Sequence, residues 1–309
     1  MSQHKFRANL RIIVPFLSLI AVMVFFTVLD PGRFSNLRNF RLILQQSAIT
    51  MTVGFGVTFV IVSGSIDLSV GSVLALAGMI GGTVASSSPL LGVLAALGIG
   101  ALCGLINGSA FSLLKVPSFI VTLGMLQAAR GLTTIYSGGF PVMMSDNTVW
   151  MGSWPGIFLI AMAVFAIAMF LYYFTRFGEY VRAIGGDETV SKMSGVPIRL
   201  YKILPFLLSG GLAGLGGFMM ASRLGVASPT IGVGYELDVI ASVVLGGTPL
   251  TGGIGNIYGT IIGAVIMASI GNGLVIMGVP SPWQLVIKGI ILVMAVFISL
   301  ERSKIGNIK

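Results

Sequence analysis

Long apolar runs separated by short polar segments dominate the chain. A helix needs about 20 mainly apolar residues to cross the hydrocarbon core of a bilayer. Ten segments reach or approach this length, and we predict a helix in each. They are 12–29, 44–63, 69–86, 90–114, 117–137, 156–174, 203–222, 236–249, 257–278 and 282–300. The pattern predicts an all-α, polytopic membrane protein with about ten spans in one domain, 1–309.

Two places in this pattern depart from simple spans. The second and third segments are joined by a polar stretch, SGSIDLS at 63–69, and the eighth segment is short and opens with Glu236 and Asp238. Non-helical backbone at membrane depth survives only where protein or a water-filled cavity satisfies its polar groups. These breaks are therefore the first markers of a transport path.

Composition supports a chain solvated largely by lipid. Of 309 residues, 55% are hydrophobic and 9% are charged, whereas soluble domains carry about 25% charged residues. The 43 glycines are typical of membrane helices, because they let backbones approach closely. The first apolar run is too long for a signal-peptide core and lacks a small-residue cleavage site, so we predict that it remains as a helix.

Basic residues indicate the orientation. With a cytoplasmic N-terminus and ten spans, twelve of the eighteen Lys and Arg residues fall inside and four fall outside, and both termini are cytoplasmic. This asymmetry follows the positive-inside rule. It fails locally at 30–41, where three arginines lie outside, and there we predict an interfacial helix on the outer leaflet. The net charge of +9 thus reflects topology rather than nucleic-acid binding.

Few side chains are available for chemistry. The sequence has no G-x-x-x-x-G-K-[ST] phosphate loop, one His and one Cys, Cys103. We therefore expect no ATP site of that type, no metal, no cofactor and no catalytic residues. A proton or sodium relay needs ionisable groups within spans, and Arg130, Lys288 and Asp67 are a small set for one. A membrane-embedded enzyme would need a polar cluster that the sequence lacks.

The longest basic loop, 175–202, contains a predicted short helix. Asp187 is a good N-cap, Glu188 favours the positive end of the helix dipole, and Gly195 is a natural stop. Pro197 prevents easy continuation. The loop therefore carries a capped helix of one or two turns.

This short helix has an apolar tip. Val190 and Met193 are three residues apart and share one face, and the glycine pair Gly185 and Gly186 provides a tightly turned entry. A projecting apolar face suits docking into a groove of a soluble partner. The other interpretation is a solvated connector whose charges only satisfy topology.

Polar residues within the spans are candidates for the translocation path. For Asp67 the alternatives are a helix cap and contact with the path, and for the asparagines they are bridging of helices and lining of the pore. For Arg130, as for Lys288, they are snorkelling or bridging and contact with the solute. The path candidates are Asp67, Ser69, Asn107, Arg130 and Asn272.

Five stretches together resemble a known family. They are SGSIDLSVG at 63–71, CGLING at 103–108, AIGGDE at 183–188 with SGV at 194–196, IGVGYEL at 231–237, and LGGTPLTGGIG at 245–255. In this order they resemble the ribose-type sugar permeases of ABC importers, with their arabinose, xylose and galactose relatives. Ser65 and Asp187 depart mildly from the family, which commonly has Gly and often Asn there.

The resemblance implies a ten-helix permease fold like that of the vitamin B12 importer, in the bacterial inner membrane. It implies a second permease copy, identical or a close paralogue, a cytoplasmic ATP-binding subunit and a periplasmic sugar-binding protein. The loop 175–202 becomes the coupling element. Its expected coupling residues are Gly186, Asp187, Glu188, Val190, Met193 and Gly195.

The expected function is passage of a monosaccharide, in first place a ribose-like pentose, with no catalysis by this chain. Other cargoes of the same superfamily remain alternatives: a furanosyl signalling molecule, a nucleoside or a branched-chain amino acid. A stand-alone secondary transporter is a further alternative, and it predicts gradient-driven uptake by this chain without an ATPase.

Overall fold

The computed structural model describes the backbone of residues 2–299 and the side chains of residues 13–297. Ten of its helices coincide with the ten predicted segments. They are α1 (Ser2–Leu29), α3 (Leu37–Val62), α4 (Val70–Ala85), α5 (Pro89–Leu113), α6 (Ser118–Ser137), α8 (Gly156–Phe174), α11 (Ile198–Leu224), α12 (Tyr235–Leu245), α13 (Ile257–Ile276) and α14 (Ser281–Ser299).

The remaining elements are short and lie between these helices. They are α2 (Pro31–Phe34), β1 (Val142–Met143), the 3-10 turn η1 (Asp146–Thr148), α7 (Val149–Gly152), α9 (Arg176–Gly186), α10 (Glu188–Met193) and β2 (Val226–Ala227). The two strands pair antiparallel, with Val142 opposite Ala227. This pairing ties the loop after α6 to the segment after α11.

Length and apolarity make the chain an all-α protein that crosses a membrane several times. Five helices, α3, α5, α8, α11 and α13, are long and apolar enough to span, and three shorter apolar segments lie in α1, α4 and α14. The 11 residues of α12 extend only about 16 Å, well short of the hydrocarbon core. The expected short eighth helix is therefore confirmed, whereas the number of ten crossings stays a prediction.

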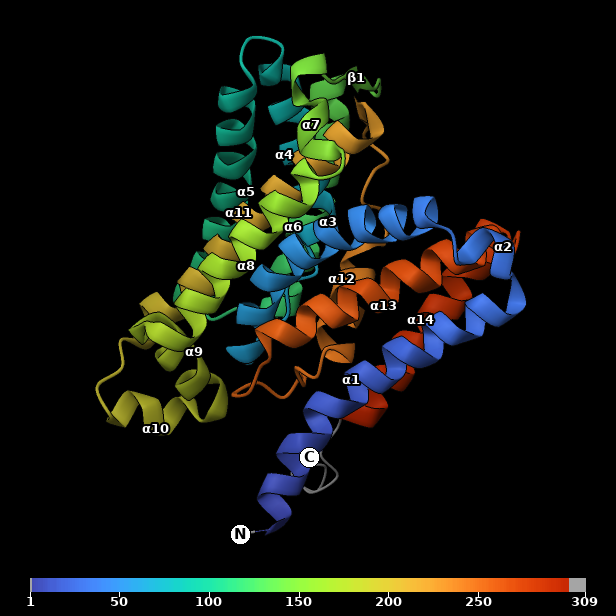
Figure 1. The fold of residues 1–309 in the computed structure, drawn as a ribbon. Helices are drawn as coiled ribbons and strands as arrows, with labels where there is room; N and C mark the ends of the chain where they lie inside the picture. Colours follow the sequence, from blue (N-terminus) through green and yellow to red (C-terminus); the bar gives the residue numbers. More distant parts are fainter. Residues whose placement is uncertain (1, 300–309) are drawn as a thin grey trace.

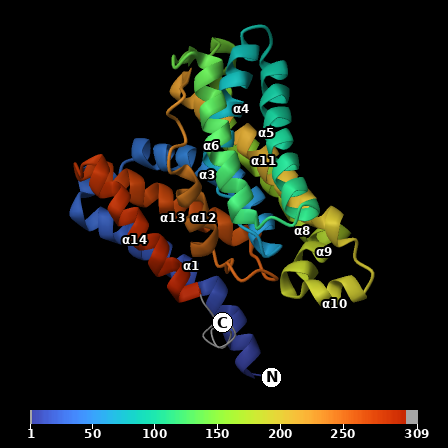
Figure 2. The same cartoon turned by 180° about the vertical axis from the view of Figure 1, so that it is seen from behind.

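Helix α3 lies between two groups of helices (Figures 1 and 2). On one side it contacts α8 and α11, and α11 packs in turn on α4 and α5; on the other side it contacts α12 and α13, which pack on α14 and α1. Every residue of 47–63 is buried. The polar residues of this stretch are serines and threonines whose hydroxyls bond to carbonyls of the same helix, so it has no charged face that needs water.

Glycines set the contact between α5 and α11. A Cβ on Gly104 would overlap the carbonyl oxygen of Phe206, and one on Gly100 would overlap that of Gly210. Small residues allow this backbone-to-backbone approach, which substitutes for the missing hydrophobic drive between helices in lipid. The glycine content noted in the sequence therefore has a specific structural use here.

The helices α4 and α12 begin beside each other inside the bundle. A Cβ on Gly71, in the first turn of α4, would lie 2.5 Å from the carbonyl oxygen of Gly232 and would overlap the Glu236 carboxylate. The segments that lead into the two helices, 63–69 and 228–234, are not helical. Two breaks predicted from sequence thus meet within the protein.

The predicted interfacial helix at 30–41 is wrong in its extent. Two separate caps divide this stretch: Asp30 accepts a hydrogen bond from the Arg33 amide at 2.9 Å, and Asn36 accepts one from the Asn39 amide at 2.8 Å. Only α2 is a separate helix, and residues 37–41 open α3. The basic side chains of the N-terminal 5–11 and of the tail 302–309 lie outside the described side chains.

Replacement of Gly104 by Ala tests the α5–α11 contact. The new Cβ meets the Phe206 backbone, so we expect a loss of about 1–3 kcal/mol of stability, the usual cost of overpacking. Thermal unfolding of the purified protein in mild detergent measures it. Gly98→Ala is the matched control on the same helix, because open space surrounds Gly98. Equal melting temperatures for the two variants would contradict the close approach.

Candidate functional site

Three of the five path candidates form one buried cluster. The Asp67 carboxylate accepts hydrogen bonds from the Ser69 amide at 3.0 Å and from the Ser69 hydroxyl at 2.6 Å. The Asn107 amide donates to the same hydroxyl at 2.9 Å, and the Ser209 hydroxyl donates to the other Asp67 oxygen at 2.9 Å. The cluster thereby joins the α3–α4 connection to α5 and α11.

This cluster is closed to solvent. Asp67, Ser69 and Asn107 are each 1% exposed, and Ser209 is fully buried. The Asn107 Oδ1 atom has no hydrogen-bond partner among the described residues. In this conformation the cluster bridges helices and does not line an open surface.

Asp67 does not cap a helix directly, which corrects one expectation. Helix α4 begins at Val70, so Ser69 and not Asp67 occupies the N-cap position. Asp67 instead accepts from Ser69 two residues later, an arrangement that Asp readily adopts ahead of a helix. Its role is to hold the capping residue and to bind Ser209.

Arg130 of α6 binds the non-helical segment that leads into α12. Its guanidinium donates hydrogen bonds to the carbonyl oxygens of Pro229 at 2.8 Å and of Ile231 at 2.7 Å. Both acceptors belong to the non-helical segment that precedes α12. Arg130 thus satisfies backbone groups that a helix would have satisfied internally.

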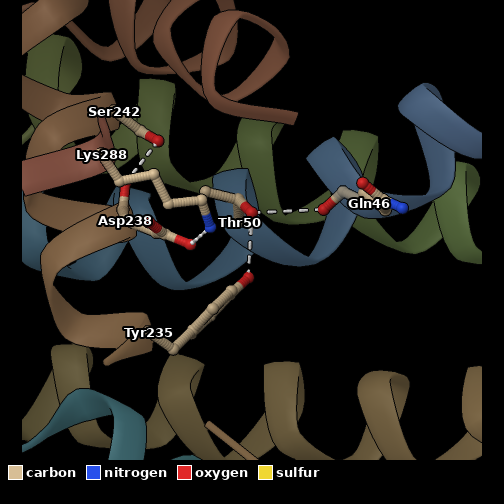
Figure 3. Close-up of polar contacts among 6 residues, drawn as sticks. All are labelled: Gln46, Thr50, Tyr235, Asp238, Ser242 and Lys288. Atoms are coloured by element: carbon tan, nitrogen blue, oxygen red, sulfur yellow. Dashed lines mark hydrogen bonds and ion pairs between the residues drawn. The ribbon is translucent and has the colours of Figure 1, made fainter. Parts of the chain in front are cut away.

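Lys288 bridges α14 and α12. Its ammonium lies 2.6 Å from a carboxylate oxygen of Asp238, and the two side chains are 24% and 22% exposed. Figure 3 shows this pair beside a second bridge, in which the Tyr235 hydroxyl lies 2.9 Å from Thr50 Oγ1 on α3. The short α12 is therefore held to both α14 and α3 by polar contacts.

Asn272 lies apart from the Asp67 cluster. Its side-chain amide donates to the side-chain oxygen Oδ1 of Asn39, and the side-chain nitrogen Nδ2 of Asn39 donates to the Phe34 backbone carbonyl at 2.8 Å. Asn272 is 8% and Asn39 is 5% exposed. This contact connects α13 to the start of α3. Of the two interpretations given for Asn272, the structure therefore shows the bridging of helices.

The predicted cap of the short helix in the loop 175–202 is confirmed. Asp187 accepts a hydrogen bond from the Val190 amide at 3.0 Å and precedes α10, which ends at Met193. Gly195 has φ +81°, a left-handed conformation that Gly adopts without strain at a helix end. The apolar tip is open to its surroundings, with Val190 58% and Met193 84% exposed.

Helix α9, the amphipathic helix that leads into α10, was not predicted from the sequence. Val181 and Ile184 of α9 are buried, whereas Gly186 and Glu188 are exposed. The Glu188 carboxylate pairs with Lys202 at 2.6 Å across the loop. Figure 1 shows the α9–α10 hairpin projecting from one end of the bundle.

The hairpin is fixed to the bundle through Gly185. A Cβ on Gly185 would overlap the Val62 carbonyl oxygen, which in turn accepts a hydrogen bond from the Gly253 amide at 2.8 Å. In the same region a Cβ on Gly252 would lie too close to the backbone of Gly64. The end of α3 and the loop between α12 and α13 therefore meet at the end of α9, where the hairpin turns into α10.

The sequence alone did not reveal several partners of the site residues. Ser209 lies in an apolar run without any local signal, and Thr50 is one of several hydroxyls in α3. Asp238 was noted only as part of a helix break. Its charge within a short apolar segment was the one signal that pointed to a pair with an intramembrane cation.

Sequence comparison identifies the relatives of the chain. A family model for the branched-chain amino acid transport system permease component matches residues 39–296. The chain is 39% identical over 302 residues to the ribose import permease protein RbsC of Escherichia coli strain K12, covering 93% of this chain and 94% of that protein.

Two further relatives agree with this result. Identity to the ribose import permease protein RbsC of Bacillus subtilis strain 168 is 40% over 299 residues, covering 94% of this chain and 92% of that one. Identity to the xylose transport system permease protein XylH of Haemophilus influenzae strain ATCC 51907 is 31% over 369 residues, covering 96% and 98%. No solved structure matches at a significant level.

The chain belongs to the family of sugar ABC importer permeases. The family match and the identity over nearly the whole chain confirm the resemblance inferred from the five motifs. The relatives are transport permease components, in agreement with the expectation of a chain that does not itself catalyse a reaction.

Replacement of Ser209 by Ala tests the buried cluster. The change removes the only Ser209 contact to Asp67, and a buried polar group left without its partner costs about 1–3 kcal/mol. We expect a lower melting temperature in detergent. Ser222→Ala on the same helix is the control, because the buried Ser222 hydroxyl has no partner among the described residues. Melting temperatures equal to that of the wild type for both variants would contradict the bridging role.

Proposed function

We propose that this permease forms the path for a monosaccharide, most specifically a ribose-like pentose, in an ATP-driven importer. The relatives named above are import or transport permeases for ribose and xylose, and both sugars are neutral pentoses. Neutral hydroxyl-rich solutes need hydrogen-bonding groups that bind weakly enough for release. This chain offers such groups in otherwise apolar helices.

The observation that carries the ATP-driven mechanism is the exposed tip of α10. Val190 and Met193 stand on a capped helix outside the apolar bundle and are 58% and 84% exposed. Apolar side chains with this exposure, on a helix with fixed caps, suit a groove in a soluble subunit. We propose that a cytoplasmic ATP-binding subunit docks here and that hydrolysis in that subunit drives passage.

The proposed topology follows from the positive-inside rule. We propose ten crossings in one domain, 1–309, with both termini in the cytoplasm and the loop 175–202 as the coupling element in the bacterial inner membrane. The resemblance adds a vitamin B12 importer-type fold. The separation of α10 from the apolar helices supports a cytoplasmic position for this end (Figure 1).

Further partners belong to the same proposal. A second permease copy, identical or a close paralogue, completes the passage, and a periplasmic sugar-binding protein delivers the solute. The loop after α6 supports an outer docking surface, since Phe140 and Met143 are 74% and 78% exposed. The β1–β2 pairing holds this loop in place.

A branched-chain amino acid is the second candidate cargo. The matching family model carries that description, although the relatives named above carry sugar names. Co-purification of the chain with the products of neighbouring genes, followed by a screen of the soluble binding protein against pentoses and amino acids, separates the two. Binding of leucine but not of ribose or xylose would reject the sugar.

A charge on the α10 tip tests the coupling proposal. Val190→Asp places a carboxylate in the docking face, and burying an unpaired charge in an interface costs several kcal/mol. We expect at least about a tenfold loss of co-purified ATP-binding subunit or of uptake per ATP, because 1.4 kcal/mol corresponds to tenfold.

Thr189→Asp is the matched control for this prediction. It adds the same charge in the same first turn of α10, where a carboxylate suits the helix dipole, at an exposed position adjacent to Val190. We expect normal assembly and uptake from this variant. Normal complex yield together with wild-type uptake by Val190→Asp would reject docking at the tip.

A further inference from the structure

Two basic residues, one on α6 and one on α14, bind α12 or the segment that leads into it. Arg130 of α6 binds the segment before α12 through the Pro229 and Ile231 carbonyls. Lys288 of α14 binds Asp238 of α12. Figure 2 shows α6 and α14 on the same side of the molecule with α12 between them.

The positions of Arg130 and Lys288, far from the ends of their helices, limit what can cover this side of the protein. Lys288 is the eighth residue of α14, and Arg130 is seven residues before the end of α6, so each lies about 10 Å from a helix end. The hydrocarbon core is about 30 Å thick. Ionisable groups at this depth face protein or water, because lipid solvates them poorly.

The Asp238–Lys288 pair is not sealed inside the protein. Its side chains are 22% and 24% exposed, in contrast to Asp67, which is 1% exposed. On α6, a Cβ added to Gly124 or Gly131 would have no atoms of other elements within 4 Å, and Gln127 is exposed. This side therefore combines open space with polar groups.

Other outward-facing helices are different. Residues 13–29 of α1, and all of α5 and α8, contain no charged residue. Their exposed side chains are large and apolar, such as Leu17 at 58%, Leu102 at 52% and Ile167 at 59%. Helices α6 and α14 also expose large apolar side chains, among them Ile135 at 78% and Val293 at 69%. The charged groups that reach α12 are therefore what distinguishes this side.

The pair has hydrogen-bonding capacity to spare. Lys288 carries three donors, and its one hydrogen bond among the described residues goes to Asp238 Oδ2. Asp238 Oδ1 accepts no hydrogen bond from the described residues. A donor and an acceptor side by side, with no net charge, match two neighbouring hydroxyl groups of a sugar and hold no ion strongly.

We propose that the Asp238–Lys288 pair contacts the hydroxyl groups of the passing sugar and helps to set which sugar passes. This proposal rests on the proposed function, since it assigns the solute contact within that transporter. The competing interpretation is a purely structural bridge between α12 and α14. A test must therefore separate solute selection from helix bridging.

The test uses the complete transporter in proteoliposomes with saturating loaded binding protein. The variant Asp238→Leu with Lys288→Met removes the hydrogen-bonding groups and keeps similar volume, a replacement that buried ion pairs often tolerate. Uptake of labelled D-ribose and of D-xylose is measured per ATP hydrolysed. We expect assembly and ATP hydrolysis to persist, with about a tenfold fall in uptake per ATP for the preferred sugar, the effect of one lost buried polar contact.

Thr50→Val with Tyr235→Phe is the matched control, because it removes the neighbouring bridge between α12 and α3 (Figure 3). We expect this variant to keep the wild-type ratio of ribose to xylose uptake. A control that loses uptake as strongly as the Leu–Met variant, with the same ratio, assigns the effect to loosening of α12 and overturns the proposal.

A third variant keeps the test decisive if the Leu–Met pair fails to assemble. Asp238→Lys with Lys288→Asp retains an ion pair but reverses donor and acceptor. A changed ribose-to-xylose ratio in this assembled variant supports solute contact, and a wild-type ratio with wild-type uptake overturns it. Failure of the wild-type complex to move either pentose rejects the proposed function itself, and this proposal with it.

Discussion

Backbone polar groups at membrane depth have to find their partners within the protein, and this constraint governs the structure. Most helices meet it internally. The segments 63–69 and 228–234 do not, so side chains supply partners for their backbone groups: Asp67 accepts from the Ser69 amide in the first segment, and Arg130 donates to two carbonyls in the second. The two irregular segments lie inside the bundle, where Gly71 and Gly232 bring the starts of α4 and α12 together. The polar residues that are candidates for solute binding therefore also make the breaks in the helices possible.

Close contacts between backbone atoms hold together the end of the bundle near α10. The last turn of α3, the α9–α10 hairpin and the loop after α12 meet through backbone atoms of Val62, Gly185 and Gly253. Side chains would have kept these segments apart. Val62 is the last residue of α3, directly before the irregular segment 63–69, whereas Gly253 lies beyond the opposite end of α12 from the segment 228–234. A displacement of the hairpin therefore acts first on the segment 63–69.

Much of the fold was predictable because its signals are local. Apolar length located all ten helices, and the Asp187 cap and the Gly195 stop follow from their own neighbours in sequence. Partners across helices were not predictable in the same way. Ser209 meets Asp67 across 142 positions, and Asn39 meets Asn272 across 233, and neither pairing leaves a trace in spacing. The division of 30–41 into two helices was missed because two capping residues, Asp30 and Asn36, outweighed the continuous apolar and basic pattern.

The contact between α5 and α11 has a mechanical consequence. Interfaces made of long side chains relax by rotamer changes, so two helices joined by them slide over one another at modest cost. Gly100 and Gly104 instead seat the carbonyls of α11 against the backbone of α5, and carbonyl groups have no rotamers. The two helices therefore move as one rigid unit. A displacement at the end of one of these helices is thus transmitted along its partner as well.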